Sequence, residues 1–364
     1  MGRKPETALA GIFRIGQGTG IGGNQAQFAC YGSAQRESLR TGIELGMAFI
    51  DSAEEYGKGA SEEMVGEVIA GLRPHVFLAS KFSPQHSDTA GVIRAAEKSL
   101  RRLGTDYLDL YQMHWPNPAV PLEDTIEGLR RLVQQGKVRM VGLCNVSLFE
   151  LKRAVEVAGE LPITSVQLEY NLNSRGVEQG ALPCCAENGI ELIAYSPLDR
   201  GKVAARWERD PELVELSQRH GKTSSQLALN WLVRVKGTLA IPYTANLTHV
   251  RENAAALDFE LSPPEIALLE SRFTEELLQI PCDRITVFAD DGSVQTLEGA
   301  LANRYGFTPS ASDLAAELFE LGSVRPVKVR KGADGYQLCE GRVRYWAWVI
   351  ANHGREPMPA YLID

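Results

Sequence analysis

The stretch Ala48–Tyr56, with the sequence Ala-Phe-Ile-Asp-Ser-Ala-Glu-Glu-Tyr, places an aspartate at the end of a short apolar run and a tyrosine five residues later. Two later segments repeat this layout, since Val76–Lys81 ends on a lysine and Tyr107–His114 ends on a histidine. Short apolar, β-prone runs of this kind are typical of buried strands. Polar groups therefore stand at the C-terminal ends of the expected strands.

Each of these strands precedes a helical pattern, so the repeating unit is strand, loop and helix over roughly 30 residues, which forces a parallel sheet. Ligands of parallel α/β folds bind outside the carboxyl ends of the strands. We therefore expect Asp51, Tyr56, Lys81 and His114 to meet in one pocket. Each residue alone has an ordinary structural interpretation, such as a helix cap or a solvated strand end, but the four together are far more specific.

The number of strand-like runs indicates how the sheet closes. Eight runs can be counted, and eight strand-helix units close a (β/α)8 barrel, the TIM barrel fold. A capped helix over Ser262–Phe273 is expected to end this barrel. The expected strands are Ile12–Gly16, Ala48–Asp51, Val76–Ser80, Tyr107–Met113, Val138–Leu143, Ser165–Tyr170, Glu191–Tyr195 and Thr238–Pro242.

The composition is that of an ordinary globular protein, with 364 residues, 44% of them hydrophobic. A net charge of −8 argues against a chain built as a whole to bind nucleic acid or an anionic membrane. No apolar run approaches the roughly 20 residues that span a bilayer, and the N-terminus lacks the apolar core of a signal peptide, so we expect a cytoplasmic protein. The six cysteines include no Cys-x-x-Cys pair, so no metal site is expected.

The strand-end residues resemble those of the aldo-keto reductases, a family with an Asp-Tyr-Lys-His tetrad at the mouth of a TIM barrel. The resemblance implies a barrel over residues 1–273 and an NAD(P)H-dependent carbonyl reductase or alcohol dehydrogenase. The matching segments cover about three quarters of the chain: Phe49–Ala53, Tyr56-Gly57, Lys81, Gln112–Pro116, Gly142–Asn145, Ala194–Leu198 and Arg251–Asn253.

The chemistry of the implied tetrad follows from the needs of carbonyl reduction, which requires a hydride at carbon and a proton at oxygen. A tyrosine hydroxyl is scarcely ionised near neutral pH, so a neighbouring cation is needed to stabilise its phenolate. In the family's arrangement Lys81 is that cation and Asp51 holds its ammonium group. Tyr56 then transfers the proton, His114 orients and polarises the carbonyl, and the cofactor supplies the hydride.

The resemblance also implies the cofactor contacts. Asn145 and Gln167 match positions that bind the nicotinamide carboxamide, and Tyr195 matches the position that stacks on its ring, although a core aromatic is an alternative. Trp115 is expected to line the substrate pocket. The remaining implied contacts are Ser196 and Leu198 at the pyrophosphate and Thr244, His249, Glu252 and Asn253 at the adenosine.

The adenosine segment departs from the family pattern. Many members carry a lysine where Tyr243 stands and an arginine where His249 stands, and those cations clamp the 2′-phosphate of NADPH. Without them a bidentate phosphate clamp is missing. NADPH is the expected cofactor, and NADH stays open.

Beyond a linker at residues 274–283, residues 284–364 are predicted to form a small α+β domain. Ser323–Asp364 resembles the nucleotide-binding module shared by ParB-type partitioning proteins and sulfiredoxin, through Tyr336–Ala347 and Met358–Ile363. The resemblance implies a phosphate site at Gly341, Arg342 and Arg344, on a helix N-terminus. The expected elements are strands at Arg284–Phe288, Pro326–Arg330 and Tyr336–Cys339, helices at Ser312–Leu321 and Arg344–Asn352, and a final edge strand from Pro357.

This second resemblance is incomplete. Val343 replaces an arginine of the phosphate motif, and Arg342 replaces the cysteine nucleophile of sulfiredoxin. No helix-turn-helix pattern accompanies the module, so DNA binding is not expected. A degenerate module kept for packing or dimerisation is an equal alternative to nucleotide binding.

Two functional hypotheses follow. The first is a reductase acting on a small-molecule carbonyl or alcohol. The second is a nucleotide-binding or phosphotransfer protein that acts through the C-terminal module, with the barrel as redox sensor or scaffold. The sequence does not indicate the oligomeric state.

Overall fold

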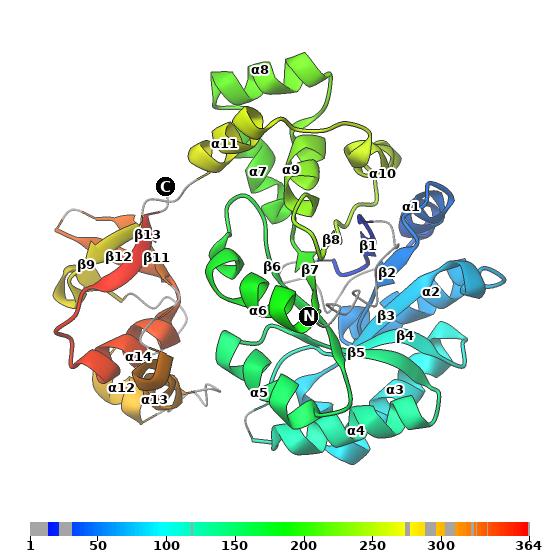
Figure 1. The fold of residues 1–364 in the computed structure, drawn as a ribbon, viewed down its shortest axis with the longest axis horizontal. Helices are drawn as coiled ribbons and strands as arrows, with labels where there is room; N and C mark the ends of the chain where they lie inside the picture. Colours follow the sequence, from blue (N-terminus) through cyan, green and yellow to red (C-terminus); the bar gives the residue numbers. More distant parts are fainter. Residues whose placement is uncertain are drawn as a thin grey trace, which may run out of the picture. The chain divides into compact units, whose positions relative to one another are not determined.

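A computed structural model describes residues 14–21, 31–117, 119–273, 277–287, 296–302, 310–321, 324, 326–332 and 334–362. The chain divides into two compact units, Met1–Phe273 and Thr274–Asp364, which the colours of Figure 1 separate at yellow. Each unit has its own sheet and its own core.

The first unit contains an eight-stranded sheet in the order β1 to β8, and every neighbouring pair of strands is parallel. This is the (β/α)8 order that the repeating strand and helix pattern predicts. The strands are β1 Gln17–Gly18, β2 Phe49–Asp51, β3 Phe77–Phe82, β4 Leu108–Met113, β5 Val138–Cys144, β6 Ile163–Glu169, β7 Glu191–Tyr195 and β8 Thr238–Ala240.

The sheet closes on itself next to β8. Ile15 forms a parallel bridge with Ala240, and the Gly16 amide donates to the Ala240 carbonyl at 2.8 Å. The first strand was predicted at Ile12–Gly16, whereas β1 is Gln17–Gly18 and Ile12 lies outside the described residues. Gly16 tolerates no side chain here because a Cβ atom would come within 2.7 Å of the Phe49 carbonyl oxygen.

Helices cover the outside of the strand ring in Figure 1. Several begin at capping residues, such as Asp88, Ser147 and Thr223, whose side chains accept backbone amides of the first turn. No helix in the described part of the chain is long and apolar enough to cross a membrane. The helices are α1 Ser33–Glu44, α2 Ala60–Ile69, α3 Thr89–Leu103, α4 Leu122–Gln134, α5 Leu148–Ala158, α6 Ala181–Asn188, α7 Lys202–Trp207, α8 Pro211–His220, α9 Ser224–Val233, α10 Leu247–Ala254 and α11 Pro263–Arg272.

The two faces of each strand enter different cores. Ile50 belongs to the large cluster between sheet and helices, whereas Phe49 belongs to a smaller cluster with Ala79 and Leu110. Phe49 stacks on Phe77 with ring centroids 5.1 Å apart. Side chains alternate along a strand, so the residue two positions after each member of this smaller cluster points to the same face of the sheet. Those residues include the polar groups at the strand ends.

The described residues of the second unit form a five-stranded mixed sheet in the order β10-β12-β11-β13-β9 and three α-helices. Its core includes Val327, Val329, Leu338, Tyr345 and Met358. The strands are β9 Leu277–Ile280, β10 Ile285–Thr286, β11 Val327–Lys331, β12 Tyr336–Glu340 and β13 Met358–Leu362, and the helices are α12 Leu297–Leu301, α13 Ala311–Leu321 and α14 Arg342–Asn352.

Two predictions for this unit differ from the structure. The predicted linker 274–283 contains β9, which pairs with β13 in antiparallel orientation. Because β9 occupies the outer position, the predicted edge strand after Pro357 is wrong, and β13 lies between β11 and β9. Phe288, the end of another predicted strand, lies outside the described residues.

Candidate active site

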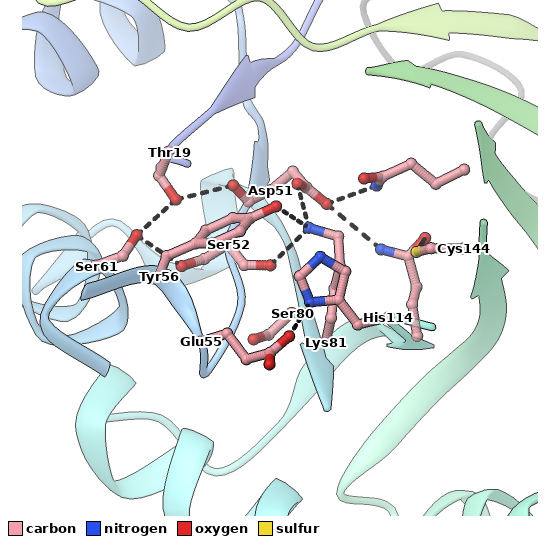
Figure 2. Close-up of polar contacts among 12 residues, drawn as sticks. Thr19, Asp51, Ser52, Glu55, Tyr56, Ser61, Ser80, Lys81, His114 and Cys144 are labelled. Carbon is pink, nitrogen blue, oxygen red and sulfur yellow. Dashed lines mark hydrogen bonds and ion pairs between the residues drawn. The ribbon is translucent and has the colours of Figure 1, made fainter. Parts of the chain in front are cut away.

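Strand alternation places the polar residues at the C-terminal mouth of the barrel. Asp51 is the last residue of β2, Lys81 lies near the end of β3, and His114 directly follows β4. In the register of the sheet, Asp51 pairs with Ala79 on the neighbouring strand β3, and Lys81 pairs with Gln112 on β4. The four residues expected to meet, Asp51, Tyr56, Lys81 and His114, are brought together in the structure (Figure 2).

Lys81 is the centre of this group and is fully buried, with 0% of its side chain exposed. Its Nζ donates to Asp51 Oδ2 at 2.5 Å, to the Ser52 carbonyl oxygen at 3.0 Å and to the Tyr56 hydroxyl oxygen at 3.1 Å. Three acceptors match the three N–H bonds of an ammonium group. Lys81 is therefore held as a cation with a fixed orientation toward the tyrosine.

Asp51 is held by amide groups as well as by Lys81. Its Oδ1 accepts from Gln167 Nε2 at 2.9 Å and from Gln112 Nε2 at 3.4 Å. The Cys144 thiol lies 3.6 Å from Gln112 Oε1. Gln112 has no role in the sequence prediction, although its place two residues before His114 puts it on the inward face of β4. That spacing was the signal that could have identified it.

The Tyr56 loop turns sharply between β2 and α2. Gly57 and Lys58 both have left-handed backbone conformations, with φ of 59° and 56°, in the short helical turn η2 Tyr56–Gly59. A Cβ atom on Gly20, in the segment after β1, would lie 2.9 Å from Cζ of Tyr56. The tyrosine ring is therefore packed between its own turn and the glycine backbone.

Hydroxyl groups fix the backbone beneath the tetrad. Thr19 Oγ1 donates to the Asp51 carbonyl oxygen at 2.9 Å and lies 2.7 Å from Ser61 Oγ, which in turn lies 2.9 Å from Ser52 Oγ. Figure 2 shows this chain on the side of Asp51 away from His114. It ties β1, β2 and α2 together at the point where Asp51 leaves the sheet.

Burial and charge set the proton affinities of the site. Burial raises the pKa of Tyr56 to about 12, although the neighbouring Lys81 acts to lower it. Burial alone would lower the pKa of Lys81, but the Asp51 carboxylate and Tyr56 outweigh it, so its pKa is raised. Tyr56 is thus protonated and Lys81 is charged at neutral pH. A protonated tyrosine beside a fixed cation can donate a proton to an oxygen that gains negative charge.

His114 stands across from Tyr56. The two rings meet edge to face with centroids 5.6 Å apart and planes at 82°. The His114 backbone is fixed on both sides, since its amide donates to the Phe82 carbonyl at 3.0 Å and its carbonyl accepts from Asn145 Nδ2 at 3.0 Å. Burial lowers the pKa of His114, a contact with Glu55 acts to raise it and Lys81 acts to lower it.

The two predicted carboxamide contacts lie beside the tetrad. Asn145 follows β5 with a left-handed φ of 57°, and its amide donates to the Gln167 carbonyl at 3.0 Å. Both side-chain amides are engaged within the protein, Asn145 with the His114 carbonyl and Gln167 with Asp51. They therefore form one network with the tetrad.

The other predicted cofactor residues follow along the barrel rim. Tyr195 ends β7, and Ser196 comes next with a left-handed φ of 47°. Asn171 Nδ2 holds this turn by donating to the Ser196 carbonyl at 3.0 Å. Leu198 packs on the main core.

The adenosine segment leads into α10. Thr244 Oγ1 accepts the Asn246 amide at 3.0 Å and lies 3.5 Å from His249 Nδ1. Asn253 is buried, with 5% exposed, while Glu252 is partly buried and His249 exposed. The rim positions predicted for one cofactor thus run in order from β5 to α10.

Trp115, the predicted pocket residue, is 48% exposed beside His114, with the two ring centroids 6.5 Å apart. It offers an apolar surface next to the tetrad. An exposed indole in this position is consistent with the prediction that Trp115 lines a substrate pocket.

The predicted phosphate residues of the second unit lie at the start of α14. Gly341 has a φ of 95°, and the helix begins at Arg342, two residues earlier than predicted. Arg344 Nη1 donates to the Pro326 carbonyl oxygen at 2.8 Å. This arginine therefore links the helix to the residue before β11.

Comparisons with known proteins identify the first unit. The family model described as the aldo/keto reductase family matches residues 14–272. The chain is 37% identical over 260 residues to the protein named methylglyoxal reductase YeaE of Escherichia coli, covering 71% of this chain and 90% of that protein.

Solved structures agree with this match. An aldo/keto reductase from Klebsiella pneumoniae in complex with NADP and acetate superposes with a TM-score of 0.65 at 39% identity, over 71% of this chain and 91% of that one. A structure from the same organism in complex with NADPH gives a TM-score of 0.66 at 38% identity, over 74% and 95% of the two chains.

The chain belongs to the aldo/keto reductase family. It is accordingly an enzyme, an NAD(P)H-dependent oxidoreductase.

Proposed function

We propose that this enzyme reduces the carbonyl group of a small aldehyde or ketone with NADPH, and that Tyr56 donates the proton. The supporting observation is the buried contact chain from Asp51 through Lys81 to the Tyr56 hydroxyl. When bound, the nicotinamide supplies the hydride. The protein's own task is then to hold a proton and a positive charge where the alkoxide oxygen develops.

The protonation state of the tyrosine favours reduction over oxidation at neutral pH. Because burial raises its pKa to about 12, Tyr56 carries the proton that reduction consumes. Lys81 stabilises the phenolate left after transfer, and Asp51 with its amide donors keeps Lys81 in place. We infer that His114 and Trp115 position the substrate on the opposite side.

The residues along the rim support a nicotinamide dinucleotide lying from Asn145 and Gln167, past Tyr195, Ser196 and Leu198, to Thr244, His249, Glu252 and Asn253. To bind a carboxamide directly, Gln167 would share its side chain between the ligand and Asp51. NADPH is the proposed cofactor because similar proteins are solved with NADP or NADPH. Methylglyoxal is a suitable first substrate to assay because a 37% identical relative is named for its reduction.

The test is the Tyr56→Phe variant, which removes one oxygen and keeps the ring that packs against Gly20. We expect loss of carbonyl reduction by at least about 100-fold, in line with general acid catalysis. NADPH affinity, measured by quenching of tryptophan fluorescence, should be unchanged. Tyr107→Phe is a matched control, since that tyrosine lies on the N-terminal side of β4, where its ring contacts Arg73. Full activity of Tyr56→Phe would refute the proposal.

A further inference from the structure

Glu55, which immediately precedes Tyr56, approaches the histidine of the site. Its Oε2 lies 2.8 Å from Nδ1 of His114, and Figure 2 shows the carboxylate reaching that ring nitrogen. The histidine side chain is 13% exposed and the glutamate side chain 40%. Nothing in the sequence prediction gave Glu55 a role.

The contact is a close pairing of a carboxylate with an imidazole. The two atoms are within hydrogen-bonding distance but lack full hydrogen-bond alignment, and Nδ1 has no other partner among the described residues. Glu54, the preceding carboxylate, is engaged elsewhere, with the Ser83 amide and His86 Nδ1, both at 2.7 Å from its Oε1.

This geometry determines where the imidazole carries its proton. A neutral imidazole has one N–H, and an ionised carboxylate can only accept, so the N–H belongs on Nδ1. Nε2 is then without a proton in the neutral ring. It can donate a hydrogen bond to a carbonyl oxygen only when the ring is the imidazolium ion.

The charged groups around the ring oppose one another. Lys81 disfavours the imidazolium, as burial does, whereas Glu55 and Asp51 favour it. Tyr56, which meets the ring edge to face, stays neutral at neutral pH because burial raises its pKa to about 12. Glu55 is the anion in direct contact with the ring.

We propose that Glu55 is a positioning residue that keeps the proton of His114 on Nδ1 and acts as the counter-ion of its imidazolium form. This inference rests on the proposed reductase function. As a consequence, polarisation of the substrate carbonyl depends on pH, because His114 donates a hydrogen bond to the carbonyl oxygen only when its imidazole ring is doubly protonated. Reduction is then favoured on the acidic side of the histidine titration.

The tautomer can be observed without turnover. Long-range ¹H–¹⁵N correlation spectra of histidine-labelled protein, with His114→Asn to assign the signal among six histidines, report which ring nitrogen carries the proton. We expect a protonated Nδ1 in the neutral ring of the wild type and a protonated Nε2 in Glu55→Ala. The same Nε2-protonated ring in both proteins would overturn the proposal.

The kinetic test uses Glu55→Gln, which keeps the shape and removes the charge, with Glu54→Gln as the control that removes a charge from the same loop. In the wild type, kcat/KM for carbonyl reduction should fall as the pH rises through the His114 titration. The Glu55→Gln midpoint should move to lower pH, the two enzymes converging in acid, while Glu54→Gln keeps the wild-type midpoint. An unmoved midpoint in Glu55→Gln would refute the role.

The two proposals fail in different ways. If the wild type reduces no carbonyl while it binds NADPH, the proposed function fails, and the tautomer spectra still decide the Glu55 to His114 contact. If the wild type is active and Glu55→Gln matches it at every pH, only the role of Glu55 is refuted.

Discussion

At the scale of single residues, Lys81 is a buried cation whose charge is balanced by Asp51 at 2.5 Å. Asp51→Asn would leave that cation in the barrel without its counter-charge, so we expect a loss of unfolding free energy of about 3 to 5 kcal/mol. The measurement is urea unfolding followed by circular dichroism. Asp51→Asn combined with Lys81→Met should recover part of the loss, and a double variant no more stable than Asp51→Asn alone would contradict this explanation.

The family resemblance implies that Tyr243 and His249 match positions where many members carry cations that clamp the 2′-phosphate of NADPH. Both are exposed, so replacement should leave the fold intact. We expect Tyr243→Lys combined with His249→Arg to raise the preference for NADPH over NADH by at least about tenfold, because charge-assisted hydrogen bonds to phosphate contribute about 1.5 to 3 kcal/mol each. The ratio of kcat/KM for the two cofactors measures this. An unchanged ratio would show that the phosphate is bound elsewhere.

The positions of Asp51, Lys81 and His114 could be predicted because strand ends are visible as transitions from apolar to polar residues. Tyr56 lies in the loop after β2, and its place was predicted from its spacing to Asp51 and from the family resemblance. The partners of Glu55 could not be predicted in this way. Its contact with His114 depends on the turn that follows, in which Gly57 and Lys58 are left-handed, and a lysine in that conformation has no sequence signature. Gln112 was accessible from strand alternation alone, because it shares the inward face with His114.

At the scale of elements, the segment after β1 supports the tyrosine loop through Gly20. Gly20→Ala would push its Cβ against the Tyr56 ring, 2.9 Å from Cζ, and displace the hydroxyl from Lys81. We expect lower kcat with NADPH affinity unchanged. Gly180→Ala is a matched control, since its Cβ would meet only Leu148 Cδ2 at 3.6 Å. Equal kcat values for the two variants would show that the close approach has no catalytic consequence.

Helix α11 begins with a capping box that makes its stability depend on pH. Glu265 Oε2 accepts from the Ser262 amide and hydroxyl, both at 2.8 Å, and Oε1 lies 3.0 Å from His220 Nε2. Burial alone would raise the pKa of Glu265, but these partners outweigh it and lower the pKa from 4.5 to about 2. The stabilisation is therefore present above pH 4.5 and is lost as the pH falls toward 2.

We accordingly expect Glu265→Gln to lower the melting temperature at pH 7 and to have a progressively smaller effect as the pH falls below 4.5. Melting curves of both proteins between pH 7 and pH 3 measure the difference. A difference that grows on acidification would contradict the assigned sign.

The elements with strong periodicity were predictable, and the short irregular ones were not. The strands β2 to β8 all begin and end within two residues of their predicted bounds. Strand β8 stops at Ala240, two residues before its predicted end, because Pro242 has no amide to continue the ladder. Strand β1 has only two residues in a glycine-rich stretch, so no alternation marks it. Strand β9 pairs with β13, about eighty positions later in the chain, and local sequence does not report such a partner.

At the scale of the whole molecule, the second unit has an independent core, and its relation to the ParB and sulfiredoxin module stays a prediction. If Gly341, Arg342 and Arg344 bind nucleotide phosphate, the full-length protein should bind CTP or ATP in isothermal titration, and Arg344→Ala should abolish the binding. Arg344 also donates a hydrogen bond to the Pro326 carbonyl, so Arg344→Ala could lose binding by unfolding. Circular dichroism must therefore show that the variant and the wild type are equally folded before their nucleotide binding is compared. No heat with either nucleotide for wild type would favour a structural unit.

The seam between β1 and β8 has a consequence for how the barrel is made. Arg14 crosses this seam with Nε on the Thr238 carbonyl, a contact between residues 224 positions apart, and the bridge from Ile15 to Ala240 lies beside it. Contacts between residues so distant in sequence have a high entropic cost of loop closure, so they form late in folding. During synthesis, the ring therefore stays open until β8 has left the ribosome, and the edge of β1 that β8 will cover is unpaired until then.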